Sequence, residues 1–465
     1  MPWQAASSCS GASMASPKQA RADWSRLPEA VVDLVARRTT NNGDYVRLRA
    51  VCTAWRSATP ARPSHLPRQL PWLVLPSPDA SGVLRFFSLP DGKTHSVQMP
   101  PGSGGSHCCG SSSGWSRADN LLGATPVASS RSNQLGSPLA EQNMPGEFFL
   151  LNPLTRERIQ LPPLDTREVL QSMALEPGGG YVVRGRPGPD FSCNLEYIRR
   201  HLVSRFVLSS DPASGDCVAM ASLCHGAIFA FCRPGRDSSW TTLTAGPFSS
   251  FQDIVFNGGR FYAVDTRLVL YVCDVGPPSR IQEFSCSSGD REQCAVLERR
   301  RRRQGQVIER AYLVESCGDL LMVLKTCDDV LATLSAGEEE NEHRPIPDFE
   351  VYKLDASDRG RRRGLPRWVE LESLGGGALF LGPGHSLSLP AGDTMGGCPG
   401  NCIYFSDHRS RKQDGAVHGG PGFGVFHLGD GHVERVLCSP VDPGSIWQPS
   451  LWISPSLRGA SPCWE

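Results

Sequence analysis

The sequence predicts a mainly β protein in which a small helical unit precedes a much longer series of β-sheets. Three observations support this fold class. Apolar residues recur at helical spacing only near the N-terminus. From about residue 70 the chain consists of short apolar runs separated by turns. Glycine (48) and proline (38) together approach a fifth of the 465 residues, which disfavours a mainly helical protein.

The overall composition is that of a globular protein without a net charge. Charged residues make up 20% and hydrophobic residues 39% of the chain. Lys+Arg and Asp+Glu both number 47, so no global field favours nucleic acid or an acidic membrane, and neither is expected as a partner. No run approaches the roughly 20 apolar residues that span a bilayer. The N-terminus lacks the basic start and apolar core of a secretory signal, so a cytoplasmic and/or nuclear location is expected.

The 17 cysteines are irregularly spaced and form no C-x-x-C pair. The nearest groupings are Cys108-Cys109 and Cys398 with Cys402. Without an export signal, we interpret the thiols as reduced, small hydrophobic residues, and a metal site is the alternative. No cofactor and no metal are expected.

Residues 1–22 are small, polar and aperiodic, which predicts a disordered tail. Leu27, Val31, Leu34 and Val35 then recur at i, i+4, i+7 and i+8, which predicts an amphipathic helix beginning at Pro28. The stretch from Thr39 to Gly43 is expected to end it.

Two further short helices are expected before Pro60. Asp44 is predicted to cap one that carries Tyr45 and Leu48. Thr53 is predicted to cap the next, which carries Trp55 and Arg56. Three helices in fewer than forty residues cannot bury all their apolar stripes against one another, so the unit is expected to need a partner surface.

The Leu27-Pro28 start, combined with Val51-Cys52-x-x-Trp55-Arg56 at the end, resembles an F-box, which we place at residues 23–66. The resemblance implies docking onto a Skp-type adaptor and, through it, a cullin-based ubiquitin ligase. By position, the adaptor-binding residues implied are Leu27, Pro28, Val31, Val51 and Cys52. An unrelated helical hairpin packed on the next domain is the alternative.

The remainder of the chain reads as repeated strand–turn–strand units. Examples are LRFFSLPDGKTHSVQMP, GEFFLLNPLTRERIQLPP and FQDIVFNGGRFYAVD, with Asp-Gly or Asn-Gly turns in two of them. Trp240 and Trp368 each precede or begin a closing strand. Such repetition predicts a β-propeller over residues 67–455, followed by a tail at 456–465.

At ~40–50 residues per blade the length suggests about eight blades, but about six units are visible, so six or seven blades are expected. The Ser/Gly-rich stretch 101–140 is expected to be a long, partly disordered loop. The C-terminal IWQPSLWISP is expected to pair with the strand near Trp72 and close the ring.

Several dispersed motifs in this region resemble one plant family. They include YLVESCGDLLMV, FEVYKLD, WVELESLGGGALFLG and GNCIYFSDH, and the similarity runs from about residue 70 to 450. Members pair an F-box with a propeller-like KIB-type domain, also called domain of unknown function 295. The Ser/Gly insert and the arginine run at Arg299–Arg303 depart from the family pattern.

The propeller region contains no specific sequence signal for a binding or catalytic site. Arg299–Arg303 and Arg361–Arg363 could form a nuclear-import signal or an anion-binding patch, but with zero net charge and an acidic stretch at 337–345 we favour solvated loops. His107-Cys108-Cys109 could bind a metal, but no second ligand cluster lies nearby in sequence. The glycine-rich pieces match no phosphate-binding motif, and no catalytic constellation is recognisable.

Together these observations predict a non-catalytic substrate receptor of a Skp–cullin–F-box ubiquitin ligase, with an unidentified target protein on the propeller. One alternative is a protein that blocks its partner directly, such as a kinase inhibitor, which the family resemblance also allows. The other is a propeller enzyme acting on a small molecule. The sequence does not distinguish the propeller face that binds the target.

Overall fold

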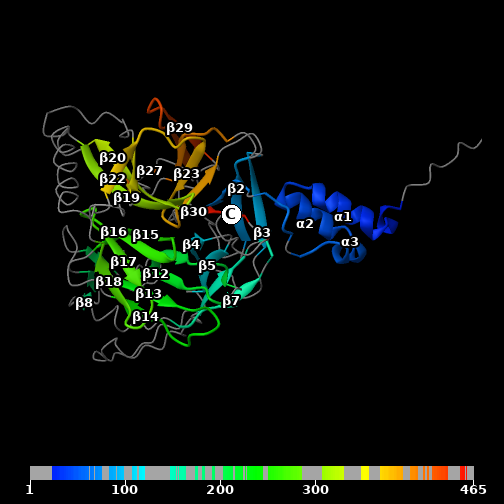
Figure 1. Cartoon of the computed structure of the whole chain (residues 1–465), viewed down its shortest axis with the longest axis horizontal. Helices are drawn as coiled ribbons and strands as arrows, with labels where there is room; N and C mark the ends of the chain where they lie inside the picture. The colour runs from blue at the N-terminus through cyan, green and yellow to red at the C-terminus, as the bar shows by residue number, and fades with distance from the viewer. Residues whose placement is uncertain are drawn as a thin grey trace, which may run out of the picture. The chain divides into compact units, whose positions relative to one another are not determined.

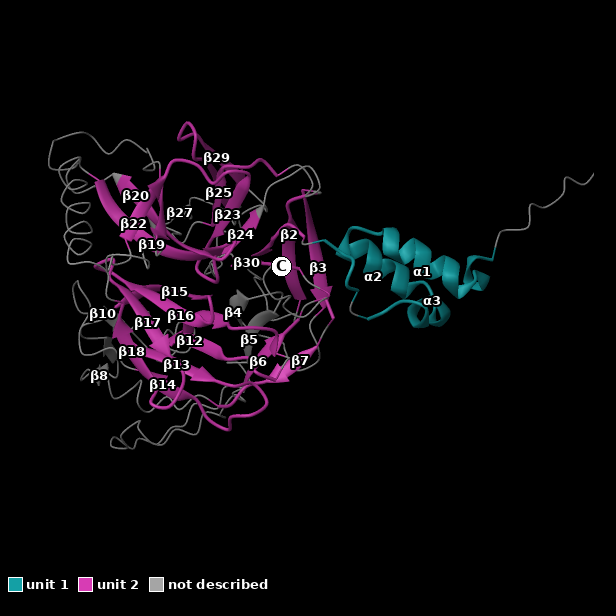
Figure 2. Cartoon of the chain, viewed as in Figure 1, with its two compact units in different colours: residues 1–67 teal, residues 68–465 magenta. Residues whose placement is uncertain are grey.

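A computed structural model of the chain describes most of the helical and strand segments. The described residues are 23–75, 83–98, 107–120, 147–163, 173–175, 181–183, 191–193, 203–243, 250–284, 306–328, 347–355, 367–390, 398–406, 412–417, 422–437 and 451–457, apart from a few single positions and pairs within these ranges. The chain forms two compact units, residues 1–67 and residues 68–465 (Figure 2).

The first unit is helical. It consists of a 3₁₀ turn and three short helices: η1 (Trp24–Arg26), α1 (Glu29–Arg38), α2 (Asn42–Ala50) and α3 (Thr53–Ser57). Its core is made by Val32 and Ala36 on one face of α1 and by Tyr45 and Leu48 on α2, all of them buried. The Tyr45 hydroxyl donates a hydrogen bond of 2.8 Å to the Pro60 carbonyl, which holds the segment after α3 against the core.

The predicted caps of α2 and α3 were wrong by one to three residues. Asn41, rather than Asp44, caps α2, because its side-chain oxygen accepts from the Gly43 and Asp44 N–H groups at 2.7 and 3.4 Å. Asp44 lies in the first turn and pairs with Arg47 instead. Cys52 caps α3 through its sulfur, which accepts from the Trp55 N–H at 3.5 Å, so Thr53 is already helical. In each case the polar atom just before the predicted cap reaches the free N–H groups first.

The second unit is built of antiparallel sheets arranged around a centre (Figure 1). Five of the described sheets have four strands. Their strands, in sheet order, are β3 (Lys93–Gln98), β2 (Val83–Ser88), β1 (Trp72–Leu75) and β30 (Leu451–Ile453); β4 (His107–Ser112), β5 (Trp115–Asn120), β6 (Glu147–Leu151) and β7 (Arg158–Gln160); β11 (Val203–Leu208), β12 (Ala219–Leu223), β13 (Ile228–Cys232) and β14 (Thr241–Leu243); β15 (Phe251–Asn257), β16 (Arg260–Asp265), β17 (Leu270–Asp274) and β18 (Arg280–Glu283); and β19 (Gln306–Ser316), β20 (Asp319–Asp328), β21 (Asp348–Asp355) and β22 (Arg367–Leu371).

A further sheet has five strands and contains one parallel pair, β23 with β25. Its order is β24 (Leu387–Pro390), β23 (Gly377–Leu381), β25 (Cys402–Ser406), β28 (Gly422–His427) and β29 (Val433–Leu437). Two small sheets accompany these, formed by β8 (Met173–Leu175), β9 (Tyr181–Val183) and β10 (Phe191–Cys193), and by β26 (Lys412–Gln413) and β27 (Ala416–Val417).

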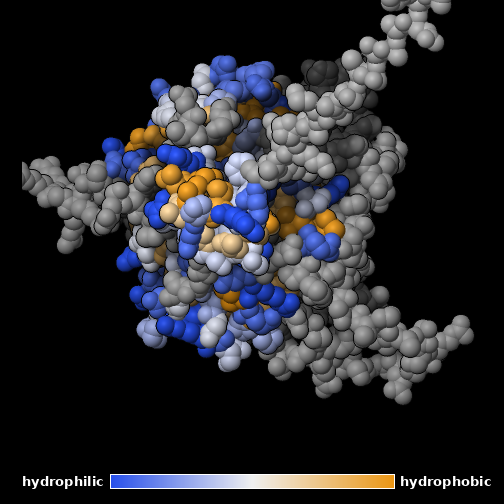
Figure 3. Space-filling model, turned by 90° about the vertical axis from the view of Figure 1, so that its right-hand side faces the viewer, coloured by the Kyte–Doolittle hydropathy of each residue, from blue (hydrophilic) through white to orange (hydrophobic). Residues whose placement is uncertain are grey.

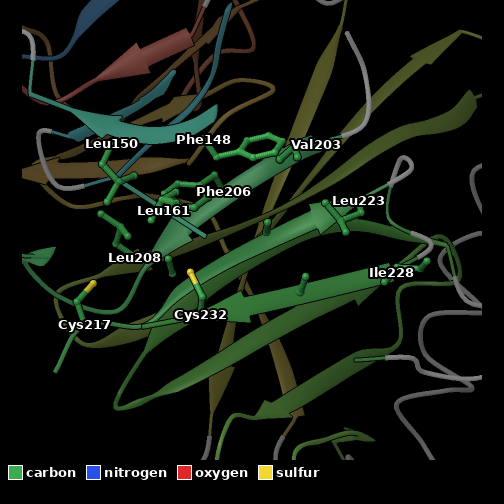
Figure 4. Packing of buried hydrophobic residues seen from close by; sticks show 13 residues of the cluster. Phe148, Leu150, Leu161, Val203, Phe206, Leu208, Cys217, Leu223, Ile228 and Cys232 are labelled. Atoms are coloured by element: carbon green, nitrogen blue, oxygen red, sulfur yellow. The ribbon is translucent and has the colours of Figure 1, made fainter. Parts of the chain in front are cut away.

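Apolar side chains fill the space between consecutive sheets. Figure 4 shows one such layer, in which Phe148 and Leu150 of β6 face Phe206 and Leu208 of β11. Similar layers join β11–β14 to β15–β18, β15–β18 to β19–β22, and β19–β22 to the five-stranded sheet. Fully burying a large apolar side chain contributes about 1.5–3 kcal/mol, so these layers are the main stabilising term of the unit. The arrangement is that of a β-propeller.

The C-terminal strand closes the ring, as expected. β30 pairs antiparallel with β1, with Leu73 opposite Trp452. The Trp452 side chain is fully buried between β1 and the five-stranded sheet, and its indole N–H donates 3.0 Å to the Leu381 carbonyl. The ends of the chain segment 72–453 are therefore held in one sheet.

The strand that follows Trp240 closes its sheet, as expected, because β14 pairs with β13. One detail differs from the expectations. Within the Ser/Gly-rich stretch 101–140, expected as a loop, β4 pairs with β5, and β5 pairs with β6. Backbone pairing to an apolar neighbour can recruit a polar strand whose own sequence carries little signal. The number of six or seven blades stays a prediction.

Replacing Trp452 by Ala is expected to destabilise the propeller by about 3–5 kcal/mol, because a fully buried aromatic side chain and its hydrogen bond are lost. Thermal or denaturant unfolding followed by intrinsic fluorescence and circular dichroism would measure this. Val369→Ala is the control, since Val369 is 37% exposed on the same unit and should change stability by less than about 1 kcal/mol. Equal losses in the two variants would contradict the closing role of Trp452.

Candidate functional site

The helical unit carries most of the large apolar side chains that the described structure leaves exposed. In α1, Val31, Leu34 and Val35 are 40%, 49% and 43% exposed. They lie beside the face that carries the buried Val32 and Ala36, so the apolar surface of α1 is wider than the part buried within the unit. We call Val31, Leu34 and Val35 the α1 apolar face.

Two further apolar side chains are exposed on this unit. Val51 follows α2 and is 55% exposed, and Trp24 in η1 is 65% exposed. Outside the unit, Val369 is the one comparable residue among the described positions. In Figure 3 apolar residues gather into groups among hydrophilic ones on the face turned to the viewer. Contiguous exposed apolar surface commonly marks an interaction site.

The residues predicted from the sequence to bind an adaptor all retain exposure. Pro28, Val31 and Val51 are exposed, and Leu27 and Cys52 are partly exposed. Pro28 is the N-cap residue of α1, and its carbonyl accepts from the N–H groups of Val31 and Val32 at 2.9 and 3.2 Å. Leu27 therefore lies at the entrance to the helix and Val31 on its first turn.

A hydrogen bond connects the two ends of the sequence motif. The Trp55 indole N–H donates 3.1 Å to the Trp24 carbonyl, which ties α3 to η1 across 31 residues. The Val51-Cys52 segment before α3 and the Leu27-Pro28 segment after η1 are thus held within one small unit. Sequence reasoning did not assign Leu34, Val35 and Trp24 to the site, although the stripe spacing of Leu34 and Val35 already contained the signal.

Ion pairs border this surface without burying charge. Arg26–Asp23, Arg37–Asp33 and Arg47–Asp44 have N···O distances of 3.2, 2.8 and 2.7 Å. Exposed pairs of this kind contribute between about 0 and 1 kcal/mol each, so they add little to the stability of the unit. The chemistry available to this site is apolar docking with a polar rim.

The propeller contains a different feature, a charged pair buried between β11 and β15, each the first strand of its sheet. Arg205 on β11 and Asp253 on β15 are 2% and 1% exposed and lie 2.7 Å apart. Asp253 also accepts from the Leu313 N–H of β19 at 2.8 Å, and Arg205 donates to the Gly384 carbonyl and, at 3.1 Å, to the Gly382 carbonyl. The pair therefore connects four sheets.

Burial shifts the pKa values of both members of the pair. Burial lowers the pKa of Arg205 to about 10, which still leaves the guanidinium charged at neutral pH. Burial raises the pKa of Asp253, and Arg205 and the Leu313 N–H act in the opposite direction. Since Asp253 accepts from three donors, we take the carboxylate as ionised. Through these hydrogen bonds the pair helps to hold the four sheets in position.

His385 lies beside this pair, in the segment between β23 and β24. Its Nδ1 atom is buried, although the residue as a whole keeps some exposure. Burial, with the charge of Arg205 as a second cause, lowers the pKa of His385 to about 4. The ring is therefore neutral at physiological pH.

The other site candidates from the sequence lie outside the described residues. Arg299–Arg303, Arg361–Arg363 and the acidic stretch 337–345 are outside the described residues, as are the side chains of His107-Cys108-Cys109. Among the positions that are described, no group of three or more His, Cys, Asp or Glu residues could hold a metal ion. None of the helices in the described part of the chain is long and apolar enough to cross a membrane.

The lowered pKa of His385 predicts a pH-dependent stability. Because the unfolded ring protonates near pH 6.5 and the folded ring near pH 4, the stability that the neutral ring provides is present above pH 6.5 and is lost as the pH falls toward 4. Between pH 7.5 and pH 5 the expected loss is about 2 kcal/mol. Unfolding measured at both pH values should show a smaller loss in His385→Asn, whereas the exposed control His432→Asn should behave like the unsubstituted protein. An identical pH dependence in His385→Asn would contradict this assignment.

Comparison with curated proteins gives relatives along nearly the whole chain. F-box protein SKIP23 of Arabidopsis thaliana is 24% identical over 461 residues, covering 94% of this chain and 97% of the relative. F-box protein At2g26160, also of Arabidopsis thaliana, is 26% identical over 391 residues, covering 83% of this chain and 96% of the relative.

Among solved structures, TolB of Acinetobacter baumannii is similar with a TM-score of 0.34 at 11% identity, covering 88% of this chain and 72% of that protein. The KIB1-4 beta-propeller family model matches residues 86–427, which is the greater part of the sequence. These residues include all or most of every sheet around the ring apart from the closing strands β1 and β30. The chain therefore belongs to the KIB1-4 beta-propeller family, and its curated relatives are F-box proteins of Arabidopsis thaliana.

Proposed function

We propose that the protein is the substrate-receptor subunit of a Skp–cullin–F-box ubiquitin ligase. In this proposal the helical unit binds a Skp-type adaptor, which links it to a cullin, and the propeller binds a target protein. The observation that carries the proposal is the α1 apolar face, which is exposed although the unit already has a core of its own. The relatives named as F-box proteins extend across this helical unit as well as the propeller.

The physical basis of the adaptor contact is burial of apolar surface. Val31, Leu34 and Val35 follow the i, i+3, i+4 spacing with which an amphipathic helix enters an apolar groove. Leu27 and Pro28 at the start of α1, and Val51 and Cys52 before α3, extend the contact. Removing this surface from water supplies the favourable free energy, at about 25 cal/mol for each Å² of apolar area.

The chain itself is non-catalytic in this proposal. Its contribution is proximity, because holding a target beside the ubiquitin-charged enzyme raises the effective concentration of the target lysine. The transfer chemistry then belongs to other subunits. Such a role agrees with a cytoplasmic and/or nuclear location.

We also propose residues 1–22 as a tail, 23–66 as the F-box, 67–455 as the propeller with an insert at 101–140, and 456–465 as a C-terminal tail. Six blades are the better of the two expected numbers, since the five-stranded sheet packs against β19–β22 on one side and against β1 and β30 on the other. A cryo-electron microscopy reconstruction viewed down the propeller axis should show six blades, and seven would contradict this count.

Val31→Asp is expected to weaken binding of a purified Skp-type adaptor by about 30-fold or more, because a charge would have to be buried in an apolar contact. Leu27→Ala with Pro28→Ala should weaken it as well. Isothermal titration calorimetry with the full-length protein would measure the dissociation constants.

The matched control is Val369→Asp. Val31 and Val369 are 40% and 37% exposed, so the same substitution is made at equal exposure on the two units. Circular dichroism would verify that both variants remain folded. Equal affinity of Val31→Asp and the unsubstituted protein for the adaptor would overturn the proposed contact.

A further inference from the structure

Three neighbouring sheets each carry a charged side chain at a β-bulge of their first strand. The register of β11 with β12 shifts just before Arg205, that of β15 with β16 just before Asp253, and that of β19 with β20 just before Arg310. β15 contacts both β11 and β19. Because a bulge re-aims the side chains beside it, the same device recurs at three charged positions on adjoining strands.

The two arginines lie close to one aromatic ring. The guanidinium carbons of Arg205 and Arg310 are 5.8 and 5.5 Å from the centroid of the Tyr312 ring, which is buried. Burial is the main cause of the lowered pKa of Arg205, and the positive charge of Arg310 adds to it. The two guanidinium groups are therefore within electrostatic reach of each other.

The described residues of this group carry more positive than negative charge. Asp253 pairs with Arg205 at 2.7 Å, and Glu309 pairs with Lys325 at 3.1 Å. Arg310 donates 3.2 Å to a backbone carbonyl, but it forms no ion pair with a carboxylate in the part of the chain that the structure describes. A poorly solvated positive charge is costly without a counter-charge, so the group favours an anion.

Four buried polar atoms of this group have no hydrogen-bond partner among the described residues. They are Arg205 Nε, Arg310 Nε, His385 Nδ1 and Ser386 Oγ. Arg205 donates to the carbonyls of Gly382 and Gly384, which holds the segment that carries His385 and Ser386 beside its guanidinium. Arg205 and Ser386 are each 2% exposed, so bulk water does not offset the cost of these unpaired donors.

We propose that Arg205, Arg310, His385 and Ser386 bind a small oxyanion, either a carboxylate or a phosphate, and we call them the Arg205–Arg310 site. The two Nε–H groups and the Ser386 hydroxyl donate to oxygens of the ion, and its negative charge offsets the excess positive charge. His385 Nδ1 donates to the ion in one tautomer and accepts from a protonated oxygen in the other. Arg310 and His385 are only half-buried, which leaves an approach from solvent on their side.

Occupancy of this site is coupled to folding. Its residues come from β11, β19 and the segment before β24, which meet only in the folded propeller, so a bound ion stabilises the folded state by mass action. The arginine run at 299–303 consists of adjacent residues that are together in the unfolded chain as well. Anion binding there is therefore expected to change the unfolding temperature much less.

The test is thermal unfolding of the full-length protein in Tris–chloride buffer, with chloride replaced stepwise by inorganic phosphate or by acetate at constant ionic strength. One of the two oxyanions should raise the unfolding temperature in a saturable manner, and isothermal titration calorimetry should give its dissociation constant. The oxyanion with the lower dissociation constant identifies the class of ligand. The proposal is overturned if neither oxyanion raises the unfolding temperature above its value in chloride.

Ser386→Ala separates ion binding from a structural role of the hydroxyl. In chloride this variant should unfold at the same or a higher temperature than the unsubstituted protein, because an unpaired buried hydroxyl is removed. In the oxyanion its dissociation constant should rise about tenfold, since a charge-assisted hydrogen bond is lost. A loss of stability that is equal with and without the oxyanion would overturn the proposal, because a bridging water would then account for the hydroxyl.

Arg310→Gln should raise the dissociation constant at least about tenfold, because it removes both the unpaired charge and an Nε–H donor. Arg310→Lys, which keeps the charge without the guanidinium geometry, should retain part of the affinity. The matched control is Arg367→Gln on β22 of the same sheet, where the side chain is 69% exposed. Affinity in Arg310→Gln equal to that in Arg367→Gln would also overturn the proposal.

Discussion

Closure of the ring is the constraint on which the propeller depends. Each sheet has two apolar faces, and a sheet is stable only when both are covered by neighbours. The pairing of β30 with β1 places residues from opposite ends of the sequence in one sheet, and Trp452 fills the space beside the five-stranded sheet. Without that strand, Phe380 and Phe423 would lose the ring that packs edge-on against both of them.

Charged side chains, and not only apolar ones, are buried where the sheets meet. The layers between sheets are apolar, whereas β11 and β15, the first strands of their sheets, meet at the buried Arg205–Asp253 pair. Such a pair adds little net stability over apolar residues, but removing one partner leaves the other charge buried without compensation. Arg205 reaches backbone carbonyls of the segment before β24, so the pair fixes how the sheets meet.

The two units distribute their apolar surface differently. The propeller buries its large apolar side chains almost completely in the described residues, with Val369 as the exposed exception. The helical unit has too few residues to cover α1 on both sides, so Val31, Leu34 and Val35 stay outside. The small unit therefore has an incomplete core and the large unit a complete one.

The sequence by itself determined what depends on neighbours along the chain. Helical spacing identified α1, Asn-Gly identified the β15–β16 turn, and repeated strand units identified a mainly β, radially repeated fold. Local signals were less reliable where two residues compete for one role, as Asn41 and Asp44 did for the α2 cap. They were also weak in β4 and β5, whose pairing is supported by β6 and not by their own composition.

Only the tertiary structure decided which distant residues meet. The apolar stripe of α1 could be identified in the sequence. The sequence did not show that Val32 and Ala36 would be buried and the stripe exposed, because burial depends on what packs against the helix. The Arg205–Asp253 pair spans 48 residues and Arg310 lies on a third sheet, and no spacing rule relates them. Their contacts arise from strand register, which is set by the pairing of whole strands and the packing of sheets.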